Sequence, residues 1–203
     1  MEEQIINMPA VALRGLTILP GMIAHFDVSR ERSLRAIEEA MEQDQKIYLV
    51  TQRNVDSEDP TQEDLYQMGI VADIKQVVRL QNDVVRILVD GISRAALLGF
   101  TGNEKYLEAE ICYCDSNADS LPEDLREAML LGVREAFHRY AAVVGKISKE
   151  LIRQIDQYED LEKLIDYVTN NLPVSYELKQ QVLEAEDIND RYQVIVSLLL
   201  SQV

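Results

Sequence analysis

The sequence has no tryptophan, only two cysteines, and 20 lysines and arginines against 36 aspartates and glutamates in 203 residues. Cys112 and Cys114 would lie on one face of a strand, where they are badly placed to bridge each other. A disulfide-stabilised secreted scaffold is therefore excluded. The shortage of positive charge argues against nucleic acid and anionic membranes as partners, because phosphate binding depends on lysine and arginine.

Long apolar runs are also missing, since none reaches the roughly 18 residues of a membrane-spanning helix. The chain opens with two glutamates, where a signal peptide needs a basic region. At 47% hydrophobic and 28% charged residues, the composition is that of a globular protein. We therefore expect a cytoplasmic globular protein.

The motifs of nucleotide, metal and covalent chemistry are absent as well. Gly145-Lys146 is followed by isoleucine, and Tyr140 stands where a phosphate-binding loop needs its first glycine. No Gly-x-Ser-x-Gly elbow marks a nucleophilic serine. The potential metal ligands lack metal-site spacing: His25, His138, Cys112 and Cys114. We expect no catalytic, cofactor-binding or metal-binding residue in this chain, and we interpret the two histidines as core, edge or boundary residues.

The first half of the chain alternates apolar and polar residues, the pattern of half-buried strands. Residues 81–83 predict a hairpin turn, and Asp90-Gly91 predicts a second tight turn. One helix interrupts the strands, with Ser29 as its expected cap and its end near Asp44. Predicted strands cover 46–52, 70–80, 84–90, 93–99 and 105–114, with an acidic loop at 54–64. This half predicts a small barrel or sandwich with one inserted helix.

After Asp115 the apolar period changes to that of helices. Residues 115–120 form a predicted linker, and Ser120 to Glu123 has the pattern of a capping box that opens a long helix ending at Gly145. Its predicted buried face consists of Leu125, Met129, Val133, Ala136, Phe137, Tyr140 and Val144. Further helices are predicted at 148–157, 159–172, 175–184 and 187–203. The fold class is therefore α+β, with a β-rich lobe at 1–115 and an all-α helical bundle at 116–203.

The last predicted helix is apolar on almost every side from Val194 to Leu200. Exposed surface of this kind promotes association. Two interpretations stay open. Either the bundle buries this helix on several sides, or the chain is a fragment whose last helix continues into another part of a longer protein.

A mixed-charge strip on the first helix is one candidate contact surface for a polypeptide partner. It consists of Glu31, Arg32 and Arg35, on the side away from the apolar face. Ion pairs between residues four apart would support the helix and would explain the same residues without a partner.

The apolar loop at 16–23 is the second candidate surface. It contains Leu19, Met22 and Ile23 around a Pro-Gly turn. Methionine is adaptable and suits promiscuous apolar binding. Core packing under the barrel is the alternative for most of these side chains.

Several segments, in order along the chain, carry a family resemblance: Leu13-Arg14, Leu19-Pro20-Gly21-Met22, 28–41, 47–52, Asp59-Pro60, 64–72, 74–80, and 85–91 with Arg94-Ala95. In order and spacing they resemble the amino-terminal domain of bacterial Lon, the ATP-dependent protease. Matches over several segments are far more specific than a single motif. The helical second half fits the same domain in length and kind, so the resemblance covers essentially the whole chain.

The resemblance implies a β-rich lobe similar to a PUA-like pseudo-barrel, followed by a helical lobe. In the family a long helix then leads to ATPase and serine-lysine protease modules. The family's amino-terminal region helps to select unfolded or damaged protein substrates and to assemble the oligomeric ring. No ATPase or protease motif stands in this sequence, so no catalytic residue is carried over, and ATP and Mg are expected only in the absent ATPase module.

Some relatives of this fold bind RNA, but the charge of the chain argues against that role here. Residues 1–115 hold 11 lysines and arginines and 20 aspartates and glutamates, with no basic stripe that could follow phosphates. Likeness of fold alone is also a weak argument for function.

Two hypotheses about function follow. The first is a non-catalytic module of a Lon-type protease that binds unfolded polypeptide weakly and helps the full-length protein to self-associate. The second is a stand-alone domain of the same family, acting as an adaptor or scaffold without an attached protease. An independent enzyme is a third possibility, against which every motif search above argues.

Overall fold

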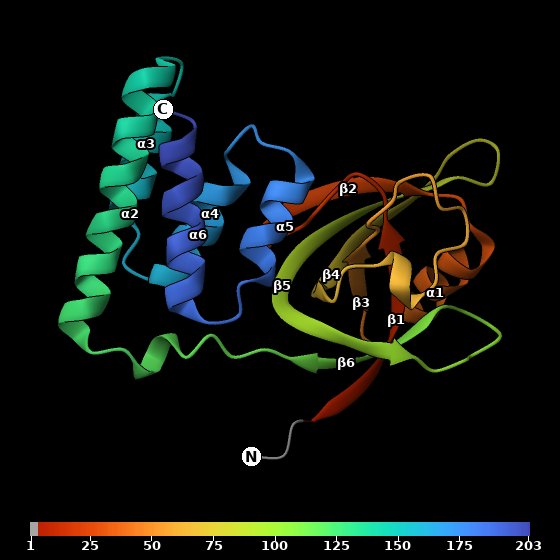
Figure 1. The fold of residues 1–203 in the computed structure, drawn as a ribbon. Coiled ribbons are helices and arrows are strands. Elements are labelled where there is room, and N and C mark those ends of the chain that lie inside the picture. Colours follow the sequence, from red (N-terminus) through yellow and green to blue (C-terminus); the bar gives the residue numbers. More distant parts are fainter. Residues whose placement is uncertain (1–3) are drawn as a thin grey trace. The chain divides into compact units, whose positions relative to one another are not determined.

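The computed structural model describes residues 4–203 of the chain (Figure 1). These residues divide into two compact units, with the boundary between Cys114 and Asp115, one residue before the predicted boundary. The first unit is β-rich and the second is all helical, so the fold class is α+β, as predicted. Among the helices in 4–203, none combines the length and the hydropathy needed to cross a membrane.

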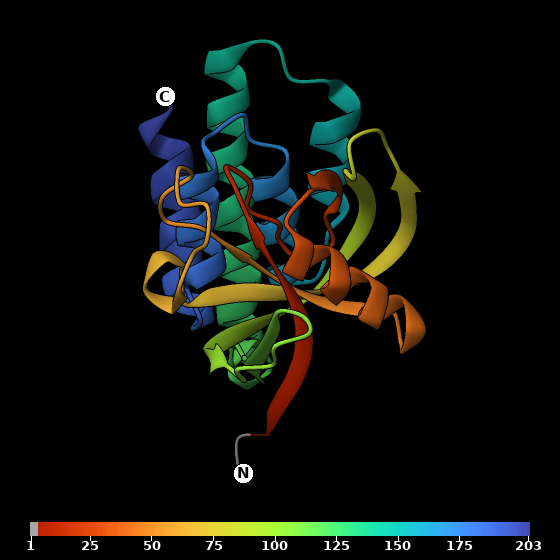
Figure 2. The same ribbon diagram turned by 90° about the vertical axis from the view of Figure 1, so that its right-hand side faces the viewer.

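The β-rich unit is built on one six-stranded sheet. Its strands are β1 (Ile5–Leu13), β2 (Ile23–Val28), β3 (Lys46–Thr51), β4 (Met68–Arg79), β5 (Val85–Phe100) and β6 (Glu108–Tyr113). The order in the sheet is β2-β5-β4-β3-β1-β6, with β1 and β3 parallel and the other pairs antiparallel. Because β5 also pairs with β6 from the far end, the sheet curls into the pseudo-barrel that the family resemblance implied (Figure 2).

The hairpin predicted between β4 and β5 is confirmed. Asn82 and Asp83 have φ angles of 61° and 59°, the left-handed conformation that tight hairpin turns use. The Leu80 N–H donates to the Val84 carbonyl at 2.8 Å and closes the turn. The short helix η1 (Gln62–Asp64) is the one regular element in the predicted acidic loop.

The predicted second turn at Asp90-Gly91 is wrong, because β5 runs through it without interruption. Gly91 instead allows the backbone at Leu19 and the side chain of Ile70 to pack closely against β5. A Cβ at Gly91 would lie 2.5 Å from the Leu19 carbonyl oxygen and 2.8 Å from Ile70 Cδ1. The pairing of β4 with β5 also shifts register between Val71 and Ala72, opposite this point. Gly91 is therefore a position where another backbone approaches a strand.

Helix α1 (Glu31–Glu42) is the inserted helix, and it packs on β1 and β3. Ser29 is not its cap, because Arg30 occupies the N-cap position and no described side chain caps the helix there. The helix ends two residues before the predicted Asp44. Its apolar side pairs with the inner face of the sheet in one core cluster, which includes Ile37, Ala40, Val11, Leu13, Ile47 and Ile70.

The helical unit follows the short helix η2 (Ala118–Ser120). Its helices are α2 (Glu123–Val144), α3 (Lys149–Gln157), α4 (Leu161–Asn170), α5 (Tyr176–Glu184) and α6 (Ile188–Ser201). Side-chain oxygens cap the last four, from Ser148, Asp160, Ser175 and Asp187, and left-handed Gly145 ends α2. The predicted capping box before α2 does not form, because Pro122 is the N-cap and the Ser120 hydroxyl donates to the Asn117 carbonyl.

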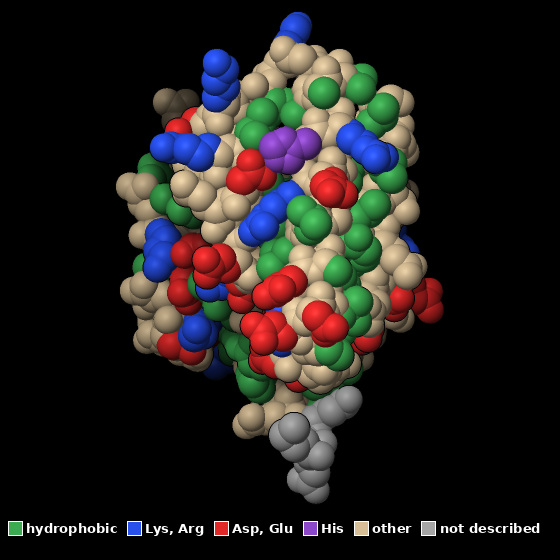
Figure 3. All heavy atoms as spheres, turned by 90° about the vertical axis from the view of Figure 1, so that its left-hand side faces the viewer, with side chains coloured by type: hydrophobic (Ala, Val, Ile, Leu, Met, Phe, Trp, Pro, Cys, Tyr) green, Lys and Arg blue, Asp and Glu red, His purple; other side chains and the backbone are tan. Residues whose placement is uncertain are grey.

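The buried face of α2 is mostly the predicted one, but its two ends, Leu125 and Val144, are exposed. In α6 the bundle buries Ile195, Leu198 and Leu199, whereas Leu200 is exposed. The surface of this unit carries further apolar side chains among charged ones, such as Leu131, which is 54% exposed (Figure 3). The helical unit thus has a closed core and a partly apolar surface.

Candidate functional site

The two arginines of the predicted mixed-charge strip hold a neighbouring loop. Arg32 Nη2 donates to the Asn103 carbonyl at 2.7 Å and to the Tyr106 carbonyl at 3.3 Å. Arg35 donates to the Lys105 carbonyl at 3.4 Å and forms an ion pair with Glu31. These side chains therefore fasten α1 to the loop between β5 and β6. They remain at the surface, so contact with a partner stays a prediction.

The loop that Arg32 holds has its own internal order. Glu108 accepts hydrogen bonds from the hydroxyls of Thr101 and Tyr106, each at 2.9 Å. Burial and the adjacent Glu108 carboxylate raise the pKa of Tyr106 to about 12. The loop is thus fixed from both sides, by α1 and by β6.

The predicted apolar loop splits into buried and exposed parts. Leu19 is 0% exposed, so its selection as a contact residue is wrong; its backbone packs against Gly91, and its side chain lies in the core. Met22 is partly buried and packs against the core cluster of the barrel. Ile23 is 67% exposed on β2 and is the residue of this loop that offers apolar surface.

A groove of about 260 Å³ lies close to this loop, between β1, β2 and the start of α1. It is lined by Val11, Ala12, Leu13, Arg14, Leu16, Phe26, Asp27, Val28, Ser29, Arg30 and Ser33. Its volume is below the roughly 300 to 1,000 Å³ of typical small-molecule sites. Its lining mixes apolar residues with three charged ones, Arg14, Asp27 and Arg30.

Two of the charged residues of the groove, Arg14 and Arg30, converge on one carbonyl. Their Nη2 atoms lie 3.4 Å and 3.0 Å from the Ser57 carbonyl oxygen, and Arg30 also donates to Gln52 Oε1 at 2.7 Å. Burial lowers the pKa of Arg30, and the nearby charge of Arg14 lowers it further. One end of the groove is therefore positive in a chain of net charge -16.

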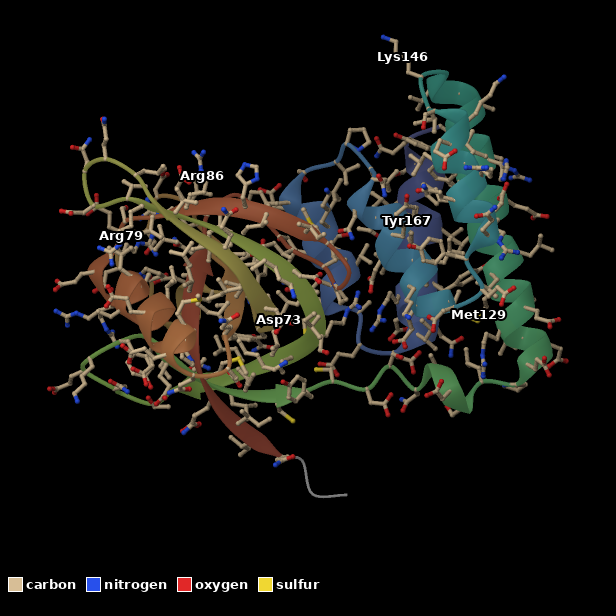
Figure 4. The ribbon with its side chains drawn as sticks, turned by 180° about the vertical axis from the view of Figure 1, so that it is seen from behind. Asp73, Arg79, Arg86, Met129, Lys146 and Tyr167 are labelled. Atoms are coloured by element: carbon tan, nitrogen blue, oxygen red, sulfur yellow. The ribbon has the colours of Figure 1, made fainter. Side chains whose placement is uncertain are left out.

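The third charged residue, Asp27, is held by Arg86 across the β2–β5 pair. Arg86 donates from Nε and Nη2 to the two carboxylate oxygens, at 2.8 Å and 3.2 Å. This hydrogen bonding lowers the pKa of Asp27. Figure 4 labels Arg86 on the outer side of the sheet. A shallow hollow beside it, of about 290 Å³, is lined by His25, Gln76, Val78, Arg86 and Leu88.

The histidines and cysteines are placed as ordinary structural residues. His25 is exposed on β2. His138 Nε2 lies 2.8 Å from Asp156 Oδ1, and both side chains are largely exposed. Cys112 and Cys114 are not joined by a disulfide. Within residues 4–203, no three His, Cys, Asp or Glu side chains gather closely enough to hold a metal ion.

Sequence reasoning missed the groove and its residues Arg14, Arg30 and Phe26. Residues far apart in the chain form it, at the place where β1 and β2 approach but do not pair. No local sequence pattern predicts that two neighbouring strands will fail to pair. The only signal was the apolar loop at 16–23, which lies between those strands in the sequence and drew attention to Ile23.

The chain combines a curled six-stranded sheet, one inserted helix and a following helical unit, which is the architecture that the family resemblance implied. Residues 7–201 match the family described as the ATP-dependent protease La (LON) substrate-binding domain. The chain therefore belongs to the Lon substrate-binding domain family, as its segments predicted.

Curated relatives agree with this assignment. The chain is 36% identical over 203 residues to the Lon protease of Lachnoclostridium phytofermentans, covering 100% of this chain and 25% of that protein. It is 35% identical over 200 residues to the Lon protease of Clostridioides difficile, with 97% and 25% covered. The chain thus spans about a quarter of the length of the curated relatives it matches, and its family match is to the substrate-binding domain.

Solved structures share the fold. The N-terminal domain of the Mycobacterium avium complex Lon protease superposes with a TM-score of 0.76 at 19% identity, covering 98% of this chain and 100% of that one. The Lon N-terminal domain protein from Xanthomonas campestris gives a TM-score of 0.63 at 14% identity, covering 95% and 98%.

Proposed function

We propose that this chain is the recognition module of a longer ATP-dependent serine protease and that it recruits unfolded or damaged polypeptides. Membership of the substrate-binding domain family supports a polypeptide ligand. The relatives are about four times as long as the chain, which supports a catalytic machinery elsewhere in the protein. The proposal includes a cytoplasmic location for the protein.

The groove between β1 and β2 is the observation that carries the proposal. Its lining includes Val11, Leu13 and Phe26, and Ile23 is exposed on β2 close to the groove. Unfolded chains differ from folded ones in exposing apolar side chains and unpaired backbone, and both suit such a groove. Contact over so small an area is weak, which lets a protease release and translocate what it has recruited.

A binding titration tests the proposal. The 203-residue chain is titrated into fluorescent α-lactalbumin that is reduced and alkylated with iodoacetamide, with folded α-lactalbumin as the control. We expect saturable binding of the unfolded form at high micromolar concentration and no binding of the folded form. Equal binding of the two forms, or none of the unfolded one, contradicts the proposal.

A matched pair of variants tests which surface of the β-rich unit binds the polypeptide. Ile23→Ser, on the strand β2 that borders the groove, should weaken binding several-fold. Leu98→Ser changes an exposed apolar residue near the end of β5, away from the stretch that pairs with β2, and should not weaken it. Thermal melting establishes that both variants fold. The same assay with Arg32→Gln and Arg35→Gln decides whether the charged strip on α1 also contacts the polypeptide.

We also propose that the helical unit contributes to assembly of the full-length ring. Exposed Leu131 and Val143 on α2 support this part, because apolar surface favours association. Sedimentation velocity over a range of concentrations should show reversible self-association that Leu131→Ser reduces. A chain that stays monomeric at high micromolar concentration contradicts an assembly role for this surface.

The gene sequence beyond Val203 separates the module from a stand-alone adaptor of the same family. A downstream phosphate-binding loop and a catalytic serine and lysine support the protease. A stop codon directly after Val203 would favour the adaptor.

A further inference from the structure

The sheet of the β-rich unit is open along one seam. β1 pairs with β6 up to Pro9, and from Val11 onward no described strand lies on that side of β1. β2 pairs with β5, and no strand within residues 4–203 pairs with its other edge. Both free edges line the groove of about 260 Å³. The groove is therefore bounded by backbone on two sides as well as by apolar side chains.

The direction of the backbone groups on β2 follows from its pairing with β5. The Gly91 N–H donates to the Met22 carbonyl at 2.9 Å, so this carbonyl of Met22 faces β5. Antiparallel strands alternate residues whose backbone groups face the partner strand with residues whose groups face away, and the register is unbroken from Ile23 to Val28. The N–H and C=O groups of Ile23, His25 and Asp27 therefore face away from β5, toward the seam.

On β1 the same alternation directs the backbone N–H and C=O groups of Ala12 toward the seam. The Gln52 N–H donates to the Leu13 carbonyl at 2.8 Å, so Leu13 faces β3 and its neighbour Ala12 faces the other way. Ala10 agrees with this alternation, because its N–H donates to the Leu107 carbonyl at 2.9 Å on the seam side. Ala12 and Asp27 thus direct backbone groups into the groove from its two walls.

We propose that an extended segment of unfolded polypeptide binds in this seam by adding to β2 as a new edge strand. This inference rests on the proposed function and specifies how the ligand is held. Main-chain hydrogen bonds do not depend on side chains, so strand addition suits a module that accepts many different unfolded chains. Every second side chain of the bound segment would face the lining of the groove, which includes Val11, Leu13 and Phe26, and the others would face solvent.

The charges of the groove should make it bind some extended polypeptide segments more tightly than others. Arg14 and Arg30 stand at one end, while the carboxylate of Asp27 is already held by Arg86. Glu58 and Asp59 act on Arg30 and offset part of its charge. The preferred ligand is therefore an apolar extended segment flanked by carboxylates rather than by lysines.

Backbone methylation of a peptide tests strand addition directly. The probe is a fluorescent peptide of about seven residues, a usual strand length, that alternates valine and threonine between terminal glutamates. Two further peptides carry N-methyl groups on alternate residues, in one register or the other. We expect at least one of them to bind about tenfold more weakly than the parent peptide, because N-methylation removes the donors that face a strand edge.

A variant of the protein gives the complementary test. His25→Pro removes one N–H from the open edge and leaves the ladder to β5 intact, and proline is tolerated at strand edges. His25→Thr changes the same side chain but keeps the N–H. We expect His25→Pro to bind the parent peptide about tenfold more weakly and His25→Thr to bind it unchanged, with circular dichroism establishing that both fold.

The outcomes separate this inference from the proposed function. Equal affinity for the parent and both methylated peptides overturns strand addition, even where the chain binds unfolded α-lactalbumin. Strand addition is also overturned if unfolded α-lactalbumin binds and the parent peptide does not. If neither binds, the proposed function itself fails. Tighter binding of a lysine-flanked peptide than of the glutamate-flanked one overturns the charge preference.

Discussion

Arg191 and Glu162 form an ion pair in the helical unit, with 3.1 Å between Arg191 Nη1 and Glu162 Oε1. Arg191 is 1% exposed and also donates to the carbonyls of Ala185 and Glu186, at 2.9 Å and 3.1 Å. One guanidinium thus joins α6 to α4 and to the end of α5. It is buried with its donors satisfied, which buried charge requires.

Removal of this guanidinium should destabilise the helical unit. Arg191→Ala removes the donors to the carbonyls of Ala185 and Glu186 and leaves a cavity where a buried side chain was, and we expect a loss of about 3 kcal/mol in the free energy of unfolding. Glu162→Gln keeps a hydrogen-bond acceptor at a partly exposed position, so its expected loss is about 1 kcal/mol or less. Urea unfolding measures both variants, and equal losses would contradict the burial argument.

Two glycines should differ in their tolerance of alanine. Gly91→Ala places a Cβ 2.5 Å from the Leu19 carbonyl, which is backbone and cannot turn away, so we expect a loss of about 2 kcal/mol or more. Gly132→Ala meets the hydroxyl end of Tyr192, which can rotate, and alanine favours the helix by about 1 kcal/mol. We expect Gly132→Ala to be near neutral in urea unfolding. A larger loss for it than for Gly91→Ala would show that the α2–α6 contact is the tighter one.

The pair of Asp27 and Arg86 predicts a pH effect. The folded-state pKa of Asp27 is lowered by the hydrogen bonds from Arg86, so its contribution to stability is present above the ordinary aspartate pKa. That contribution is lost as the pH falls from there through the lowered folded value. A carbon-detected NMR titration should find the Asp27 pKa below its usual range, and Arg86→Gln should return it toward that range. An unchanged pKa in the variant would refute the assignment of cause.

The two arginines of α1, Arg32 and Arg35, should contribute differently to the free energy of unfolding. Arg32 makes the shorter hydrogen bond to the loop between β5 and β6, so Arg32→Ala should cost about 1 kcal/mol. Arg35 is half-exposed and its bond to the Lys105 carbonyl is long, so Arg35→Ala should stay within about 0.5 kcal/mol. Thermal unfolding provides the comparison. Equal losses would mean that the loop is held by something other than Arg32.

Helix starts were predictable where a capping side chain acts alone. Ser148, Ser175 and Asp187 stand at the first residues of predicted helices, and each accepts a backbone N–H. Asp160 caps a helix that was predicted to begin at residue 159. Ser29 and Ser120 have the same chemistry but do not cap. Ser120 instead donates to the Asn117 carbonyl, and the helix that Ser29 precedes begins one residue later. At Ser120 a competing contact therefore replaced the cap, whereas nothing in the structure explains why α1 begins one residue later than predicted.

The candidate site was less predictable than the fold. The sequence offered Ile23 and Leu19 together as candidate contacts and could not separate the exposed residue from the buried one. The difference arises from the close approach of Leu19 to Gly91, a contact between residues far apart in the chain. The groove depends on a strand pairing that does not form, and no residue pattern encodes it.

Residue-resolved amide exchange tests the central claim, that unfolded polypeptide binds in the groove between β1 and β2. Exchange rates of the 203-residue chain are measured by NMR with and without unfolded α-lactalbumin. We predict that exchange slows several-fold at Ala12 and Asp27, while Phe26, which already pairs with β5, is unchanged. Slowing confined to the α1 strip around Arg32, or no slowing at Ala12 and Asp27 under saturating ligand, would contradict the account.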